Sequence, residues 1–218
     1  MIKFIIFASS FRLFGLVGSG LAILGAAIAG AAYRGSQGER FSPLNHYVSE
    51  LGEVGVSRLA WVFNLSLIFA GLCLILACTS LGFMLPGALA KIGMAVGIIC
   101  SISLSLVGVF PMNKENYHGA AAMTFFRAGL LMVVFFSLAI ALQSNVELIL
   151  PRVYWLAGLP ATLSFSGFLV LISIKTNLDE PPLRLDEVKR PKVWLLVIIE
   201  WLIFVTIVAW FLVIVVGL

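Results

Sequence analysis

Four residues of this chain have the types and spacing for acid–base chemistry: His46, Ser49, Glu50 and His118. The first three lie in the segment FSPLNHYVSELG, and the last lies in FPMNKENYHG. His46 and Glu50 are four residues apart, so a helix would place an imidazole beside a carboxylate on one face. A neutral imidazole can act as a base that the carboxylate orients, which makes these residues candidates for a catalytic site.

The first segment also has the pattern of a short capped helix without a catalytic role. Ser42 can cap its start, Pro43 fits the first helical position and Gly52 can end it. Such a helix is typical of the membrane surface, where its polar face stays in water. The sequence therefore leaves a catalytic site and an interfacial helix open as alternatives.

A metal site is a further alternative for the two histidines, which are the only ones in the chain. A metal would need a third ligand, for which Glu50 and then Glu115 are the candidates. The histidines lack HExxH-type spacing, and no dinucleotide-binding, Walker or haem motif is present. We therefore predict no bound metal and no other cofactor.

Six long apolar segments must position these residues. Hydrophobic residues make up 61% of the 218 residues and charged residues only 11%, which is too little charge for the surface of a water-soluble domain. Each segment has about the 20 residues that a helix needs to cross a bilayer. We predict an all-α bundle of six transmembrane helices, forming a single integral membrane domain with a short interfacial helix in its first loop. The predicted spans are residues 11–32, 58–82, 89–110, 118–143, 153–174 and 193–218.

Small residues at four-residue intervals predict which helices pack closely. They form stripes in the first and third helices, where a second backbone can approach. The fifth helix has a similar stripe, so these three helices should form the tight interior of the bundle. The sixth helix is rich in Trp and Phe and should face lipid or a partner protein at the edge. The stripe residues of the first and third helices are Gly18, Ala22, Ala26, Gly30, Gly93, Gly97 and Ser101.

Two charged residues fall inside predicted spans, where an unpaired charge is costly. By the helical rise, Arg127 lies about 13 Å past His118, and Glu200 lies about 12 Å past Lys192. Both distances start from the same membrane face, so the two depths match. We therefore predict a buried ion pair between Arg127 and Glu200, with either a structural or a functional role.

Positive charge is unevenly distributed between the two faces of the predicted bundle. The first, third and fifth loops share one face and hold nine Lys and Arg, whereas the other face holds four. The positive-inside rule places these odd-numbered loops in the cytoplasm and both termini outside. The run KRPK before the sixth helix is predicted to be a solvated basic edge. Its charge suits anionic lipid, so membrane lipids are the expected partners and nucleic acid is not.

Three stretches resemble a known membrane family: SPLNHYVSELG, FNLSLIFAGL and GVFPMNKENYHGAAA. The chain resembles the bacterial and archaeal family known as domain of unknown function 998, over roughly residues 13–174. It is similar in outline to the more distant damage-regulated autophagy modulators. The resemblance implies a six-helix protein of the prokaryotic plasma membrane without a settled activity. The residues that it would bring to one face are Ser49–Gly52, Asn64, Phe110, Pro111 and His118.

Three functions remain open. The favoured hypothesis is a non-catalytic subunit, scaffold or lipid-binding accessory protein of a membrane assembly, with other subunits contacting the sixth helix. The alternative is a membrane-embedded hydrolase or lipid-modifying enzyme that uses His46, Ser49, Glu50 and His118 at the interface. The third is a small transporter, which would need more polar groups along a path through the bilayer than this chain has.

Overall fold

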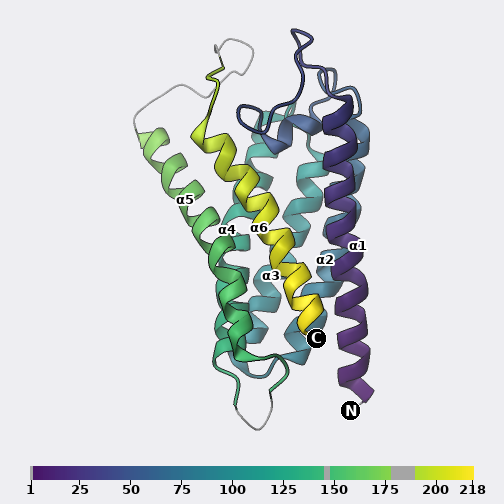
Figure 1. Cartoon of the computed structure of the whole chain (residues 1–218), viewed down its shortest axis with the longest axis vertical. Helices are drawn as coiled ribbons and strands as arrows, with labels where there is room; N and C mark the ends of the chain where they lie inside the picture. Colours follow the sequence, from purple (N-terminus) through teal and green to yellow (C-terminus); the bar gives the residue numbers. More distant parts are fainter. Residues whose placement is uncertain (1, 145–147, 178–189) are drawn as a thin grey trace.

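The chain is mostly helical over the residues that the computed structural model describes, which are 2–144, 148–177 and 190–218 (Figure 1). Each of its six long helices is apolar and long enough to cross a membrane. Two short 3-10 helices, η1 (Val48–Gly52) and η2 (Arg152–Ala157), precede α2 and α5. The predicted all-α bundle of six helices, with a short helix in its first loop, is therefore confirmed. The long helices are α1 (Ile2–Ala32), α2 (Ala60–Met84), α3 (Gly87–Val109), α4 (Glu115–Ala141), α5 (Gly158–Asn177) and α6 (Leu195–Gly217).

Two local features differ from the sequence-based expectation. The first helix starts at Ile2 rather than at residue 11, because the mostly apolar residues before residue 11 continue the same helix. The helix in the first loop is shorter than its capping pattern predicts. The backbone amides of Asn45 and His46 both donate to the carbonyl of Ser42, at 3.1 and 2.9 Å, and form a turn there. The 3-10 helix begins only after this turn.

The six helices form a closed ring. Each packs against its neighbours in the sequence, and α1 packs against α6 to complete the ring. Both termini lie at one end of the bundle, and the segment between α1 and α2 lies at the other (Figure 1). We call this second end the loop-1 end. The starts of α2, α4 and α6 therefore lie at the same end of the bundle as that segment.

Glycines allow the first three helices to approach each other closely. A Cβ atom added at Gly71 would lie 2.5 Å from the carbonyl oxygen of Ser101, so α2 and α3 are in direct backbone contact there. A Cβ at Gly18 would lie 3.2 Å from the carbonyl oxygen of Ala70 on α2. Gly30, by contrast, would meet nothing closer than Leu51 at 3.8 Å.

The remaining small residues of the two stripes also lie at helix contacts. Ala22 and Ala26 are buried. An added Cβ at Gly93 would touch the ring of Phe136, and one at Gly97 would touch the thiol of Cys78. At Gly93 and Gly97 the stripe of α3 therefore makes room for side chains of neighbouring helices rather than for another backbone.

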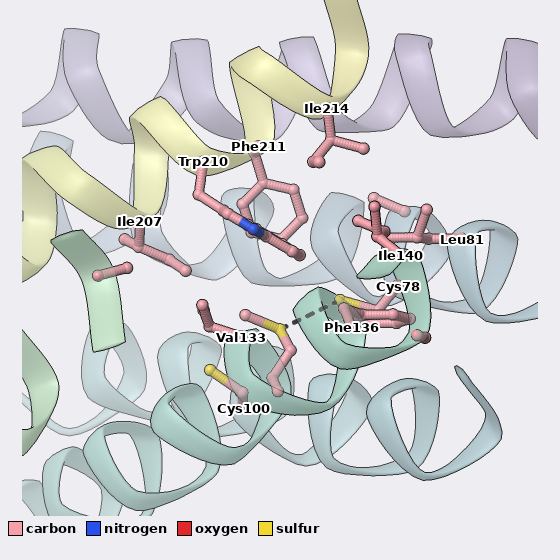
Figure 2. Close-up of a cluster of buried hydrophobic side chains, with 14 of the residues drawn as sticks. Cys78, Leu81, Cys100, Val133, Phe136, Ile140, Ile207, Trp210, Phe211 and Ile214 are labelled. Carbon is pink, nitrogen blue, oxygen red and sulfur yellow. Dashed lines mark hydrogen bonds between the residues drawn. The ribbon is translucent and has the colours of Figure 1, made fainter. Parts of the chain in front are cut away.

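The sixth helix packs one face into the core. Leu202, Val205 and Val216 on its other face are exposed, so the expectation that it faces lipid or a partner protein stays a prediction. Trp210 and Phe211 are almost fully buried, and the ring of Trp210 lies 6.1 Å from that of Phe136 on α4 (Figure 2). The same cluster contains a contact of 3.6 Å between the sulfur atoms of Cys78 and Met132 (Figure 2). The large side chains of α6 fill the space between it and α4, so this helix needs no stripe of small residues there.

The fifth helix is the least buried of the six spans, which also differs from the expectation. It packs against α4 through aromatic side chains, with the rings of Phe126 and Phe168 centred 4.2 Å apart. Phe165 packs over Gly129, where an added Cβ would approach its ring to 2.6 Å. These phenylalanines pack α5 against α4, and the small residue Gly158 also lies against α4, where an added Cβ would meet the hydroxyl of Ser137.

Candidate functional site

The first loop folds into the bundle instead of lying on its surface. Glu50 is fully buried and accepts two hydrogen bonds from Arg190, at 3.0 Å to Oε1 and 2.7 Å to Oε2. Its Oε1 also accepts a bond of 2.8 Å from the backbone amide of Tyr47, and Arg190 donates a further bond of 3.1 Å to the carbonyl of Asn45. The prediction that the polar face of the first-loop helix stays in water is therefore wrong for Glu50. The prediction that the basic segment before α6 is solvated is wrong for Arg190, which is bound to Glu50.

The electrostatics of Arg190 reflect this pairing. Partial burial alone lowers the pKa of a guanidinium, but here the hydrogen bonds and negative charge of Glu50 outweigh it and raise the pKa of Arg190 above its ordinary value. Arg190 therefore stays charged, and its bidentate contact with Glu50 fixes the first loop.

Two further hydrogen bonds join the first loop to α6. The indole of Trp201 donates to the carbonyl of His46 at 3.1 Å. The backbone amide of Trp194 donates to the carbonyl of Leu44 at 2.8 Å. With the Glu50–Arg190 pair, these bonds anchor the turn and η1 against the start of α6.

Glu200 on α6 faces η1 and not Arg127. Its Oε2 accepts a hydrogen bond of 2.9 Å from the backbone amide of Val48, and Ser49 lies beside this carboxyl group. Arg127 is exposed on α4. The predicted ion pair between Arg127 and Glu200 is not formed, because the two side chains point in different directions from helices that are not neighbours in the ring.

His46 is buried in an aromatic environment. Its ring lies 5.4 Å from that of Tyr33 and 5.2 Å from that of Phe41. Its Nε2 is 3.8 Å from a carboxylate oxygen of Glu39, while Glu50 is bound to Arg190. The structure thus does not bring His46 and Glu50 together as an imidazole–carboxylate pair.

His118 lies near the start of α4 and has a defined tautomer. Its Nδ1 is 2.8 Å from the carbonyl oxygen of Phe110. A carbonyl oxygen can only accept a hydrogen bond, so Nδ1 carries the proton. In the neutral ring Nε2 then carries a lone pair that can accept a hydrogen bond or a proton.

A cavity in the centre of the ring brings three of these polar residues together. Residues of α1, α2, α3, α4, α6 and η1 line it. Ser49, His118 and Glu200 lie near the loop-1 end, where α4 and α6 begin. The opposite end is lined by Leu74 and Phe211. Glu200 and Phe211 are eleven residues apart on α6, so the cavity extends about 16 Å along the bundle.

The cavity is mostly apolar. Its volume is about 100 Å³. Ser19 and Ser101 are the polar residues away from the loop-1 end, and Ser101 is bonded to the carbonyl of Gly97 at 2.8 Å. No lysine or arginine is among the described residues that line it.

The residues considered as metal ligands do not converge. Within residues 2–144, 148–177 and 190–218, no group of three His, Cys, Asp or Glu side chains is arranged to hold a metal ion. His118 lines the cavity, whereas His46 and Glu50 are bound within the first loop. The alternative of a metal held by His46, His118 and Glu50 therefore has no support from this geometry.

Sequence reasoning missed the two residues that anchor the first loop, Arg190 and Trp201. No local pattern pairs Arg190 with Glu50, because the two are 140 residues apart in the chain. The signal that was available was Glu200. An ionisable residue inside a span marks either a functional or a structural site, and Glu200 lies where η1, α6 and the cavity meet.

Comparison with known proteins identifies the family. The family model described as "Protein of unknown function (DUF998)" matches residues 16–217. No curated protein and no solved structure matches the chain. The match spans nearly the whole chain, so the protein belongs to this family, and its six apolar helices make it an integral membrane protein.

Proposed function

We propose that this membrane protein of the DUF998 family is a non-catalytic lipid-binding protein that holds the apolar chain of one membrane amphiphile in its central cavity. The observation that carries the proposal is the composition of the cavity. Its polar side chains Ser49, His118 and Glu200 gather near the loop-1 end, and its opposite end is apolar. An amphiphile has the same division between a polar head and an apolar chain.

The lining of the cavity supports an apolar occupant rather than water. Ligand sites are commonly lined mainly by apolar side chains, as this cavity is. Purely apolar cavities of about 150 Å³ stay dry and take up apolar molecules. Water in the deep part would find few partners, because Leu74, Phe211 and Met132 form its walls. A hydrocarbon chain needs no hydrogen-bond partner.

The length of the cavity supports a single extended chain. It follows the axis of α6 for about 16 Å, a little over half the hydrocarbon thickness of about 30 Å. The surrounding bilayer contains lipid chains of comparable length. The lipids of the surrounding membrane could therefore themselves supply the ligand.

A mass measurement with matched variants tests this proposal. Ala22 lines the cavity, whereas Ala27 on the same helix is exposed. Ala22→Leu should fill part of the cavity and displace the lipid, while Ala27→Leu should leave it bound. Native mass spectrometry after extraction in mild detergent should show one retained lipid on the wild type and on Ala27→Leu, and none on Ala22→Leu. Equal lipid retention by all three would contradict the proposal.

One observation favours a second candidate function, a lipid-modifying enzyme. The hydroxyl of Ser49 and the lone pair on His118 Nε2 belong to residues that line the same end of the cavity. In this function His118 would act as a base and Ser49 would present its hydroxyl to the lipid head. Ser49→Ala would then abolish turnover of a bound ester while lipid retention persists. If the wild type retained the lipid but did not turn over the ester, the enzymatic function would be ruled out and the binding function would stand.

We also propose that the loop-1 end of the cavity faces the cytoplasm of a prokaryotic cell. The support is the distribution of basic residues. The odd-numbered loops at this end hold nine Lys and Arg, whereas the opposite face holds four. Gln37 is exposed in the first loop. A Gln37→Cys variant should react with a membrane-impermeant maleimide in inverted vesicles and not in intact cells, and the reverse pattern would overturn this orientation.

A further inference from the structure

We infer that the amphiphile in the cavity has a head that donates hydrogen bonds and carries no negative charge, as in a long-chain alcohol or amine. This inference rests on the proposed lipid-binding function and adds the chemical class of the head. It follows from the hydrogen-bonding groups and charges that line the loop-1 end of the cavity.

The first acceptor for such a head is His118. Its Nδ1 proton is used by the carbonyl of Phe110 at 2.8 Å, so the ring offers the lone pair of Nε2 as its remaining polar group. His118 lines the cavity. A hydroxyl or ammonium group can donate to this nitrogen, whereas an unprotonated phosphate or carboxylate oxygen cannot.

The second acceptor is the carboxyl group of Glu200. It already accepts from the backbone amide of Val48 at 2.9 Å, and Ser49 lies beside it. Its two oxygens offer more acceptor positions than this bond uses, so the group retains capacity for a donor from the cavity side. A head with one or two donors therefore suits Glu200 and His118 together.

The described lining of this end of the cavity offers no cation that could compensate an anionic head. No lysine or arginine is among the described residues that line the cavity. Arg190 lies near the first loop but gives two hydrogen bonds to Glu50, at 3.0 and 2.7 Å, and a third to the carbonyl of Asn45. A phosphate placed beside Glu200 would be a buried charge without a partner, which is strongly unfavourable.

Alcohols and amines are distinguished by their dependence on Glu200. An alcohol needs only an acceptor, which an amide oxygen can also provide. An ammonium group also gains from the negative charge of an ionised carboxylate. Replacing Glu200 by Gln keeps an oxygen that can accept from Val48 and removes the charge, so it should reduce amine binding selectively.

The test uses three ligands with the same chain and different heads. The full-length protein in lipid nanodiscs is titrated with tetradecanol, tetradecylamine and tetradecyl phosphate at neutral pH, with displacement of a fluorescent fatty alcohol as the signal. We expect the alcohol and the amine to bind at least about tenfold more tightly than the phosphate, which corresponds to about 1.4 kcal/mol. Equal binding of all three, or tightest binding of the phosphate, overturns the inference and leaves the chain-binding function standing. Binding of none overturns both.

Two variants assign the effect to the acceptors. In Glu200→Gln the amine should lose at least about fivefold in affinity relative to the alcohol, and an unchanged ratio would contradict the role of Glu200. His118→Leu removes the lone pair and should weaken both ligands, and unchanged affinities would contradict the role of His118. Arg127→Gln on the exposed face of α4 is the control. Thermal melting of each variant in the same nanodiscs verifies that it is folded.

Discussion

The guanidinium of Arg190 holds the buried carboxylate of Glu50 through two hydrogen bonds of 3.0 and 2.7 Å, across 140 residues of sequence. The pair fastens the first loop to the segment that leads into α6. The same loop supplies Val48, which donates a hydrogen bond to Glu200, and Ser49, which lines the polar end of the cavity. The Glu50–Arg190 pair therefore positions one wall of the candidate site without lining it.

Arg190→Leu should destabilise the protein strongly because it leaves the carboxylate of Glu50 buried without its cation. Removing one partner of a buried pair typically costs about 3–5 kcal/mol, and the partial exposure of Arg190 favours the lower end. Thermal melting in detergent should show a large decrease for this variant. Lys192→Leu is the matched control, since Lys192 is exposed two residues further along.

The double variant Glu50→Leu with Arg190→Leu separates pairing from other effects. Since it removes both charges, it should melt at a higher temperature than Arg190→Leu alone. Additive losses in the double variant would mean that the two side chains stabilise the protein independently, against the structure.

Gly71→Ala should disrupt the contact between α2 and α3. The added Cβ would lie 2.5 Å from the carbonyl oxygen of Ser101, and a backbone atom cannot easily move away. Overpacking of this kind costs about 1–3 kcal/mol. Gly20→Ala on α1 meets nothing within 4 Å and should be neutral or slightly stabilising, since alanine favours a helix. Similar melting temperatures for the two variants would contradict the close approach of α2 and α3.

Tyr33 and Tyr47 should ionise only at unusually high pH. Burial raises the pKa of both above the ordinary value of 10.0, and the negative charges of Glu50 near Tyr33 and Glu200 near Tyr47 raise it further. The folded state thus favours the neutral phenols. Their contribution to stability is complete below the unfolded pKa of about 10 and is lost as the pH rises above it.

A spectrophotometric titration with Tyr33→Phe and Tyr47→Phe checks this. Each substitution should remove one late-ionising phenol from the absorbance change at alkaline pH, and loss of an early-ionising one would contradict the burial. The hydroxyl of Tyr33 has no hydrogen-bond partner within the described residues. Tyr33→Phe should therefore leave the melting temperature unchanged or raise it, because it removes an unsatisfied polar group.

The composition and lengths of the apolar segments were sufficient to predict six helices, because hydropathy and span length are local properties. They were not sufficient to predict the partners of Arg127 and Glu200. Helical rise gives the depth of each residue but not the direction in which its side chain points, nor which helices are neighbours. Arg127 points outward from α4, and Glu200 points toward η1.

The structure of the first loop was also not predictable from the sequence. The capping pattern around Ser42 and Gly52 predicted a helix there, and the structure has a turn followed by η1. The burial of Glu50 depends on Arg190, which follows a long segment before α6. Pairing between distant loops is decided by how the helices pack, and nothing in the spacing of either segment indicates it.

Arg127→Leu should have little effect on stability. The side chain is exposed on α4 and forms no ion pair with Glu200, so its removal should change the free energy of unfolding by at most about 0.5 kcal/mol. The measurement is thermal melting beside Glu200→Leu, which should be clearly destabilising because Val48 loses its acceptor. If Arg127→Leu lowered the melting temperature as much as Glu200→Leu, the result would favour an ion pair between these residues and contradict the structure.

The occupancy of the cavity by a lipid chain is tested most directly by photo-crosslinking. A long-chain alcohol with a diazirine at the end of its chain is irradiated with the protein in nanodiscs, and the adducts are mapped by mass spectrometry. Insertion near Leu74, Met132 and Phe211, which line the cavity far from the loop-1 end, is the predicted result. Adducts confined to outward-facing residues such as Leu24 and Leu163 would show that the chain stays in the bilayer, and would contradict it.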